Sequence, residues 1–252
     1  MNNKDRYTKF KADEIAIWKN RFIFRSSTND MAFNNVSLVK YLSEQKPFAS
    51  CTTIRNVNDF WKLVQKSAND YREWCYNINP DLSDKTLGEL KYFFIGCIGE
   101  YFFCKLFEIK NTLYIKQNKK IYTFSYVCPR LIDEKDYGVD LTGTVATNEN
   151  KCWDCAFQVK FWNPYCKDFE MTYGILSKTS TDAIWNDFID KNDKENIFVC
   201  WLNNTDTCVS KALRKSPIWD NLVFIDKKVL NDNINNKVPQ IWDIFFESIN
   251  QF

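Results

Sequence analysis

Two stretches of the chain repeat apolar residues at steps of three and four positions, which is the spacing of one face of a helix. The first occupies 58–75, and the second runs from Thr86 to about Phe107. Thr86-Leu87-Gly88-Glu89 fits a capping box and predicts the start of the second helix. Weaker patterns of the same kind predict a helix near 181–191 and a closing helix at 240–246.

Shorter apolar runs with strand character lie between and after these helices. They occupy 112–115, 121–126, 137–145, 153–162, 197–202 and 222–225. The polar segment Asn148-Glu149-Asn150-Lys151 separates two of them and predicts a β-hairpin. The run 197–202 is apolar throughout, as in a strand covered on both faces. The order helix, antiparallel strands, helix, strand predicts an α/β fold with a mixed sheet flanked by helices.

Histidine is absent from the 252 residues. Its absence excludes Ser-His-Asp and Cys-His nucleophiles, His-ligated metalloproteases, His-based nucleases and zinc deaminases. Glycine occurs six times and never as a G-x-G pair, which excludes the glycine-rich dinucleotide and phosphate-binding loops. Acid–base or metal chemistry must therefore use carboxylates, lysines, tyrosines or thiols, and the metals expected with such oxygen ligands are Mg²⁺ or Mn²⁺.

Charge and cysteine content indicate the environment of the protein. The net charge is +2, so nucleic-acid binding would need a local basic patch. The first five residues have no apolar stretch typical of a signal peptide, and the longest apolar run, 92–107, is interrupted by Glu100 and Lys105. We therefore expect no membrane span and a cytoplasmic protein whose ten cysteines are mainly buried, reduced thiols.

Four cysteines offer an alternative to buried thiols. Cys152 and Cys155 form a C-x-x-C pair, and Cys128 and Cys166 could complete four thiolate ligands for structural zinc. A second C-x-x-C pair is missing, and Cys155 shares the inward-facing parity of the Phe157-Val159-Phe161 positions. Buried thiols are therefore the preferred interpretation.

The hairpin carries the first candidates for chemistry. Gln158 and Lys160 alternate with apolar residues, so they share one face of their strand, about 6.6–6.8 Å apart along it. Asp140 alternates with Val139 and Leu141 on the preceding strand. If the two strands pair, a carboxylate, an amide oxygen and an ammonium group converge at one edge of the sheet.

The second long helix carries another candidate, Glu100. The residues one turn away from it are Gly96, Cys97, Phe103 and Cys104. A carboxylate in such apolar surroundings is costly unless it is paired with a Lys or Arg or binds a cation. Gly96 and Gly99 would let this helix approach the sheet closely.

A helical Glu, then Gly-Val-Asp-Leu, then Phe-Gln-Val-Lys, followed by helix and strand, resembles the PD-(D/E)XK nuclease superfamily, the restriction-endonuclease-like fold. The resemblance covers 86 to about 203 and implies an α-β-β-β-α-β core. It places Asp140 as the acidic residue of the second strand, Gln158 and Lys160 as the (D/E)-x-K pair, and Glu100 as the first-helix glutamate. Two positions depart from the pattern, because Gln158 stands for the usual carboxylate and Val139 stands where the family name has proline.

The resemblance implies a metal site and a reaction. Asp140 and Glu100 would hold Mg²⁺ or Mn²⁺, with the Gln158 side-chain oxygen or the Val159 carbonyl as a further ligand. Lys160 would orient or deprotonate the water, or neutralise charge on the phosphoryl group. These four residues, Asp140, Gln158, Lys160 and Glu100, are the predicted catalytic set.

The implied function is a metal-dependent endonuclease that hydrolyses DNA, first of all of the restriction or defence type. Cutting both strands with a single-site fold needs two copies, so a homodimer or a partner nuclease subunit is expected. A transposition or repair nuclease is an alternative. A non-catalytic module that binds nucleic acid or protein with a nuclease-like fold is another, and the neutral Gln158 is the feature that favours it.

Other interpretations of the same residues stay open. Gln158 and Lys160 could line a solvated sheet face, and Glu100 could pair with a nearby base for structure only. The fallback carboxylates are Asp133, Asp136 and Asp154.

Contacts to nucleic acid are predicted for a small basic cluster, Lys211, Arg214 and Lys215, and for Trp162, which follows the strand of Lys160. The predicted organisation has three parts. A mostly helical region at 1–84 serves recognition, dimer contact or partner docking, the nuclease-like core occupies 85–230, and a helix in 231–252 packs on that core.

Overall fold

The fold was analysed in a computed structural model of the chain. It describes residues 2–24, 37–49, 54, 56–116, 118–129, 131, 139–149, 151–161, 171, 195–203, 205–234 and 240–252. The described α-helices are α1 (Asn3–Ala12), α2 (Glu14–Arg21), α3 (Leu38–Gln45), α4 (Val57–Ile78), α5 (Asp84–Ile109), α8 (Thr205–Cys208), α9 (Lys211–Arg214), α10 (Lys227–Ile234) and α11 (Gln240–Ile249). The strands are β1 (Thr112–Ile115), β2 (Lys120–Pro129), β3 (Leu141–Thr147), β4 (Cys152–Lys160), β5 (Ile197–Trp201) and β6 (Leu222–Ile225), and a 3₁₀ turn, η2 (Pro217–Asn221), precedes β6.

The six strands form one mixed sheet in the order β1-β2-β3-β4-β5-β6. The first four strands pair antiparallel, and β4, β5 and β6 pair parallel. The carboxyl ends of β4, β5 and β6 therefore meet at one edge of the sheet, which is where open α/β sheets bind ligands. The predicted α/β class and mixed sheet are confirmed, while the specific nuclease-like topology stays a prediction.

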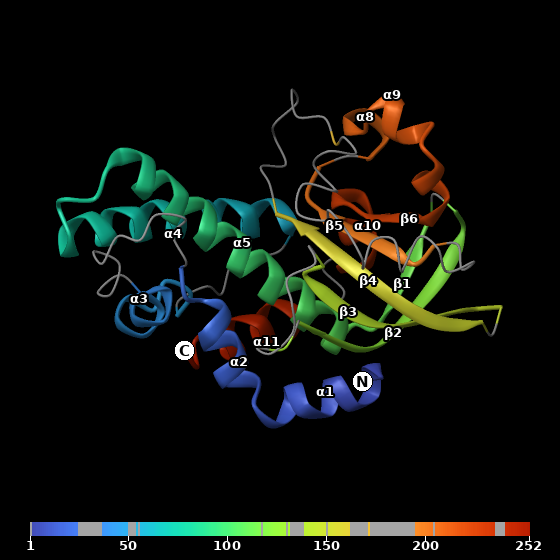
Figure 1. The fold of residues 1–252 in the computed structure, drawn as a ribbon, viewed down its shortest axis with the longest axis horizontal. Coiled ribbons are helices and arrows are strands. Elements are labelled where there is room, and N and C mark those ends of the chain that lie inside the picture. The colour runs from blue at the N-terminus through green and yellow to red at the C-terminus, as the bar shows by residue number, and fades with distance from the viewer. Residues whose placement is uncertain are drawn as a thin grey trace.

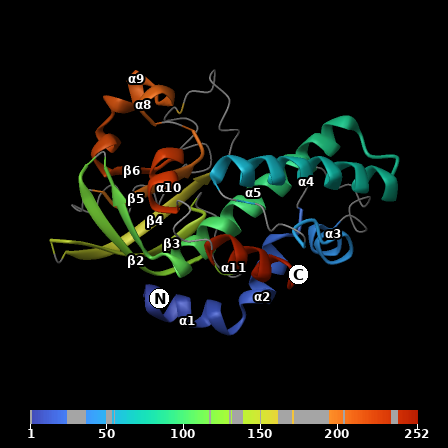
Figure 2. The same ribbon diagram turned by 180° about the vertical axis from the view of Figure 1, so that it is seen from behind.

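Figure 1 shows the helices in two groups around this sheet. The long helices α4 and α5 lie side by side and extend away from the strands, a relation that the reverse view repeats (Figure 2). α10 packs against β1 and β6, and α1 runs along β2 and β3. α8 and α9 stand at the opposite end of the molecule from α1.

The sheet has a different core on each face. Alternate residues of β5 separate cleanly, because Phe198 and Cys200 join the large core beneath α5, whereas Val199 and Trp201 join a smaller core beneath α9. All five residues of β5 are buried. This confirms the prediction that an uninterrupted apolar run forms a strand covered on both faces.

Three predicted helices, at 58–75, 86–107 and 240–246, and the six predicted strands lie where the hydrophobic pattern placed them, with shifts at some ends. The start of α5 differs, because the hydroxyl of Ser83, not Thr86, caps the helix by accepting a hydrogen bond from the Thr86 N–H at 3.2 Å. β3 begins at Leu141, so Asp140 lies just before the strand and not inside it. The helix expected near 181–191 lies outside the described residues.

The described helices of the N-terminal region pack into the same large core as the sheet. Phe10, Trp18 and Phe22 are almost completely buried, and Phe22 contacts the ring of Phe252 at the other end of the chain, with 5.2 Å between ring centroids. The boundaries 1–84, 85–230 and 231–252 stay a prediction. No described helix combines the length and apolarity needed to cross a bilayer.

Candidate functional site

Asp140 is fixed at the start of β3 by three bonds to the neighbouring strand. Its backbone N–H donates to the Phe157 carbonyl at 3.0 Å. Its Oδ2 atom accepts from Gln158 Nε2 at 2.7 Å and from the Val159 N–H at 2.6 Å. The structure therefore brings Asp140 and Gln158 together as the hairpin predicts, and both side-chain bonds are strong when the Asp140 carboxylate is ionised.

Gln158 is 3% exposed, and its amide is only half satisfied. Because Nε2 faces the Asp140 carboxylate, the amide orientation is set by that bond. The carbonyl atom Oε1 is buried and has no hydrogen-bond partner. A buried oxygen without a partner is costly, so this atom is a position where a missing ligand would be stabilising.

Lys160 lies two residues beyond Gln158, at the carboxyl end of β4 and on the same sheet face. It is partly buried and pairs in register with Trp201 of β5. Its ammonium group lowers the pKa of Asp140. The positive charge of Lys160 therefore acts on the Asp140 carboxylate.

Glu100 reaches the same region from α5 because of a close helix–sheet contact. Gly99 lies directly against Phe161, and a Cβ at Gly99 would overlap that side chain. Gly96, expected to help in the same way, has open space around it. The next residue, Glu100, is partly buried, and its Oε2 atom accepts a charged hydrogen bond from Arg21 Nη2.

Arg21 is the charged residue at this site that sequence reasoning missed. It is the last residue of α2 and lies far from the motif along the chain. Burial lowers the pKa of Arg21, but the carboxylates of Glu100 and Asp140 raise it more, so the guanidinium stays charged. A weak signal was present, because Ile17, Trp18 and Arg21 are spaced as one side of a helical turn.

The electrostatics of the site disfavour the ionised form of Asp140. Burial and the neighbouring Glu100 carboxylate raise the pKa of Asp140 to about 7, against the opposing effects of Lys160, the Val159 N–H and Arg21. A divalent cation bound here would offset the repulsion that the Glu100 carboxylate exerts on a charged Asp140.

The chemistry of the donors fits a hard cation. Asp140 and Glu100 offer carboxylate oxygens, and Gln158 Oε1 is the buried oxygen without a partner. These are the ligand types that Mg²⁺ and Mn²⁺ take. Among the described residues, no cluster of three or more His, Cys, Asp or Glu side chains is present, so any cation here would rely on two carboxylates and the amide.

The predicted nucleic-acid contacts are less clear in the structure. Arg214 uses its guanidinium within the chain, donating from Nη2 to the Thr205 carbonyl at 2.5 Å and stacking on Trp219 with 5.4 Å from Cζ to the ring centroid. Lys211 and Lys215 are exposed. Trp162 lies outside the described residues.

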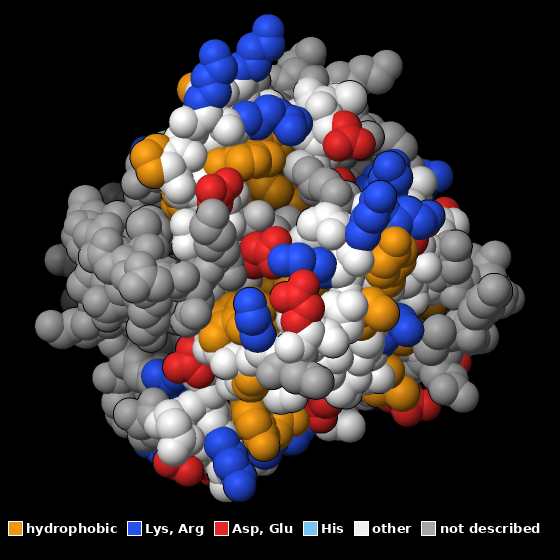
Figure 3. Space-filling view, turned by 90° about the vertical axis from the view of Figure 1, so that its right-hand side faces the viewer, with side chains coloured by type: hydrophobic (Ala, Val, Ile, Leu, Met, Phe, Trp, Pro, Cys, Tyr) orange, Lys and Arg blue, Asp and Glu red, His pale blue; other side chains and the backbone are white. Residues whose placement is uncertain are grey.

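Charge is mixed on the face that contains the end of the molecule near α9. Several Lys and Arg side chains gather at the top of this face, where α8 and α9 lie (Figure 3). Elsewhere on it, Lys and Arg alternate with Asp and Glu, and the described part of the chain forms no continuous basic surface there. Any contact with a nucleic acid is therefore local, as the net charge of +2 predicts.

The alternative cysteine site is not supported by the strand geometry. Cys152 is exposed, whereas Cys155 is completely buried on the opposite face of β4, because residues three apart in a strand point to opposite sides. Cys128 is buried in the large core, and Cys166 lies outside the described residues. Burial also raises the pKa of the Cys155 thiol, which disfavours a thiolate.

The fallback carboxylates do not join the site. The Asp154 carboxylate Oδ1 accepts from Asn3 Nδ2 at 2.8 Å and so serves the packing of α1 on the sheet. Asp133 and Asp136 lie outside the described residues.

Comparison with known proteins found no matching family model, no matching curated protein and no matching solved structure.

Proposed function

We propose that this protein is a Mg²⁺-dependent phosphodiester hydrolase acting on DNA, with its site formed by Asp140, Glu100, Gln158 and Lys160. The observation that carries the proposal is the combination at one sheet edge of a buried Asp140 carboxylate, whose pKa is raised to about 7, and the buried, unpartnered Gln158 Oε1. Both features are unfavourable in the protein alone, and a hard cation would relieve both.

Each residue has a distinct task in this proposal. Asp140 and Glu100 would bind the cation, and Gln158 Oε1 would complete its protein ligands, with the Val159 carbonyl as the alternative oxygen. The cation would supply Lewis acidity toward a phosphate oxygen and toward water. Lys160, already acting on Asp140, would orient the attacking water or stabilise charge that develops on the phosphoryl oxygens.

The restriction or defence role and the assembly are the finer part of the proposal. The chain offers one such site among its described residues, so cutting both strands of a duplex would use two copies or a partner nuclease subunit. Supporting arguments are the resemblance of residues 86–203 to PD-(D/E)XK nucleases and the location of the site at the carboxyl ends of parallel strands.

A second candidate function, a non-catalytic binding module, is favoured by one contact. Glu100 is paired with Arg21, which satisfies its charge without a cation. In that case Asp140, Gln158 and Glu100 would only stabilise the fold. The two candidates differ in cation binding, because a module has no reason to bind Mn²⁺ at this edge.

The decisive test is cleavage of supercoiled plasmid and short single strands with Mg²⁺ or Mn²⁺. Cleavage that is lost in Lys160→Ala and kept in Lys151→Ala would support the proposal, because Lys151 lies just before the same strand, is exposed and is distant from Asp140. Equal cleavage by wild type and Lys160→Ala would contradict it. If neither cuts, calorimetric titration with Mn²⁺ decides, and equal lack of binding by wild type and Asp140→Ala would favour the module.

A further inference from the structure

Arg21 lies in the candidate site with hydrogen-bonding capacity to spare. Its side chain is 17% exposed, its Nη2 donates to Glu100 Oε2, and its Cζ lies 5.8 Å from the centroid of the Trp18 ring. Its Nε is buried and has no hydrogen-bond partner. A guanidinium has five N–H donors, so a buried one with an unused donor is poised to bind an oxygen-rich anion.

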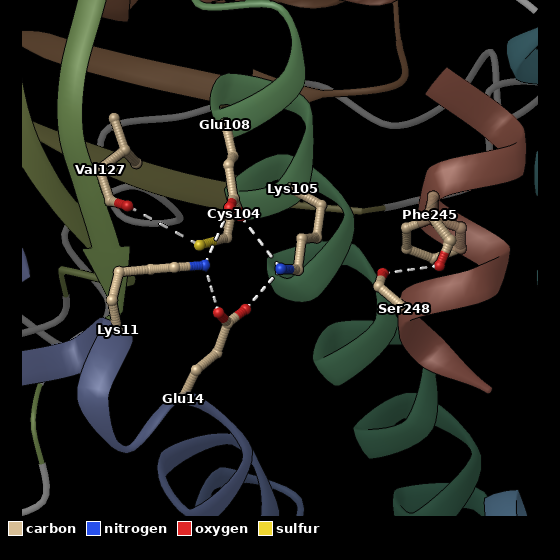
Figure 4. A network of polar contacts seen from close by, with 8 residues as sticks. All are labelled: Lys11, Glu14, Cys104, Lys105, Glu108, Val127, Phe245 and Ser248. Atoms are coloured by element: carbon tan, nitrogen blue, oxygen red, sulfur yellow. Dashed lines mark hydrogen bonds and ion pairs between the residues drawn. The ribbon is translucent and has the colours of Figure 1, made fainter. Parts of the chain in front are cut away.

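The segment that carries Arg21 is fixed to α5 by a ring of charges (Figure 4). Lys11 and Lys105 each contact both Glu14 and Glu108. Lys105 lies 2.5 Å from Glu14 Oε1 and 3.0 Å from Glu108 Oε2, and Lys11 lies 2.8 Å from Glu108 Oε1. The ring joins the end of α1 and the start of α2 to one turn of α5.

Aromatic packing completes the attachment one turn closer to Arg21. Trp18 meets Tyr101 edge to face with 5.0 Å between ring centroids, and Phe22 contacts the same Tyr101 ring. The Cys97 thiol lies 3.8 Å from the Arg21 carbonyl. Arg21 is therefore held on both sides by residues of α5, and it is presented to Glu100 by packing and not by chance contact at a surface.

Charge balance shows what this arginine adds to the site. Asp140 and Glu100 contribute two negative charges when both are ionised, and Lys160 and Arg21 contribute two positive ones. The site alone is thus neutral, which is poor for binding an anion. A divalent cation would leave an excess of two positive charges, and half of the protein's own positive charge at the site comes from Arg21.

We propose that Arg21 is a phosphate-binding residue of this site, supplied by the N-terminal region that lies outside the nuclease-like motif. It pairs with Glu100 while the site holds no substrate. With Glu100 as a cation ligand, the guanidinium would be free to donate to the oxygens of a phosphodiester, for which its planar fork is well suited. This inference rests on the proposed function and names a residue that the motif does not contain.

In the competing interpretation, Arg21 inhibits the site by blocking cation binding. In that case the guanidinium occupies the position of the cation, and removing it strengthens cation binding and cleavage. The buried Nε without a partner favours the phosphate-binding role, because a residue that only neutralised Glu100 would gain stability by using both edges of its fork on that carboxylate.

The test is binding of a fluorescein-labelled 20-base-pair DNA duplex in Ca²⁺, followed by fluorescence anisotropy, with a gel to verify that the probe stays intact. Arg21→Gln should weaken binding about tenfold, the loss of one charged hydrogen bond. The slope of log affinity against log salt should fall by about 0.9, the value for one phosphate contact. Mn²⁺ affinity should not fall, because Arg21 is not a ligand and its ion pair with Glu100 is the contact that a cation would replace.

Lys19→Gln is the matched control, since it removes a positive charge from an exposed position of the same helix. Its affinity and salt slope should match the wild type. The double variant Arg21→Gln/Glu100→Gln tests whether the loss of duplex affinity in Arg21→Gln comes from misfolding. Its two amide side chains can hydrogen-bond to each other without charge and so replace the ion pair. Recovery of duplex binding in this double variant would overturn the proposal, and so would tighter Mn²⁺ binding with faster cleavage in Arg21→Gln.

The outcomes separate this inference from the proposed function. Wild-type protein that binds the duplex and cuts in Mg²⁺, with Arg21→Gln unchanged in both affinity and salt slope, would overturn the role of Arg21 alone. Wild-type protein that neither binds the duplex nor takes up Mn²⁺ would overturn both.

Discussion

Gly99 of α5 packs against Phe161, the residue that follows β4, so closely that a Cβ on the glycine would overlap the phenylalanine side chain. This contact sets the distance between the helix that carries Glu100 and the strand that carries Gln158 and Lys160. The candidate site therefore depends on the absence of one methyl group.

Gly99→Ala should destabilise the fold by about 1–3 kcal/mol, because overpacking displaces side chains or backbone. Gly96→Ala is the internal control, since its Cβ meets nothing within 4 Å. Because alanine has a higher helix propensity than glycine, Gly96→Ala should stabilise the fold by up to about 1 kcal/mol. Urea unfolding of the two variants measures both effects, and equal stability of the pair would contradict the role given to the close approach.

The pH dependence of stability should carry a contribution from Asp140. Its pKa is raised to about 7 in the folded protein, so between the unfolded value of about 4 and 7 the folded state binds the extra proton. This contribution favours folding below pH 4 and is lost as pH rises through 7. In EDTA, Asp140→Asn should therefore raise the melting temperature at pH 8 and change it little at pH 4. Equal shifts at both values would mean that Asp140 does not titrate in this way.

The substitution Gln158→Glu should make the stability of the protein depend on metal. A third carboxylate beside Asp140 and Glu100, at a position only 3% exposed, should destabilise the metal-free protein by several kcal/mol. Mn²⁺ should return most of this loss, because a ligand that binds only the folded state stabilises it. Thermal unfolding in EDTA and in Mn²⁺ tests the expectation.

Gln158→Met is the matched control for that experiment. It keeps the side-chain length and removes both the bond to Asp140 and the unpartnered Oε1. Its melting temperature should respond less to Mn²⁺ than that of the wild type. A Glu variant that is as stable as wild type in EDTA would show that the three side chains do not converge.

The ring of charges at α1, α2 and α5 should contribute measurable stability. Lys105→Met leaves Glu14 and Glu108 with Lys11 as their remaining partner in the ring, and Lys105 is only 11% exposed in its side chain. The loss should be about 1–3 kcal/mol, between the values for exposed and buried pairs.

Lys66→Met is the comparison for the ring, because Lys66 pairs with Asp70 on the surface of α4 with its side chain 75% exposed. Its effect should lie within about 0.5 kcal/mol. Urea unfolding in low and high salt compares the two, and a Lys105→Met variant as stable as Lys66→Met would show that the ring is solvated.

Local periodicity determined the parts of this protein that depend on neighbours along the chain. The alternation in β4 places Gln158 and Lys160 on one face, and the short polar turn after β3 brings Asp140 beside Gln158, because a hairpin pairs the strands nearest in sequence. The helical spacing of apolar residues likewise located α4 and α5. These features follow from backbone geometry, which is the same wherever the segment lies.

The tertiary structure decided every relation between segments distant along the chain. In the structure Gly99, and not Gly96, contacts the sheet, and the partner of Glu100 is Arg21, 79 residues away. The N-cap of α5 is Ser83 and not Thr86. The two hydroxyl side chains have similar capping preference, so the path of the chain that enters the helix decides which of them caps it. A sequence pattern contains spacing along the chain, whereas these choices depend on which surfaces meet in space, and only packing determines that.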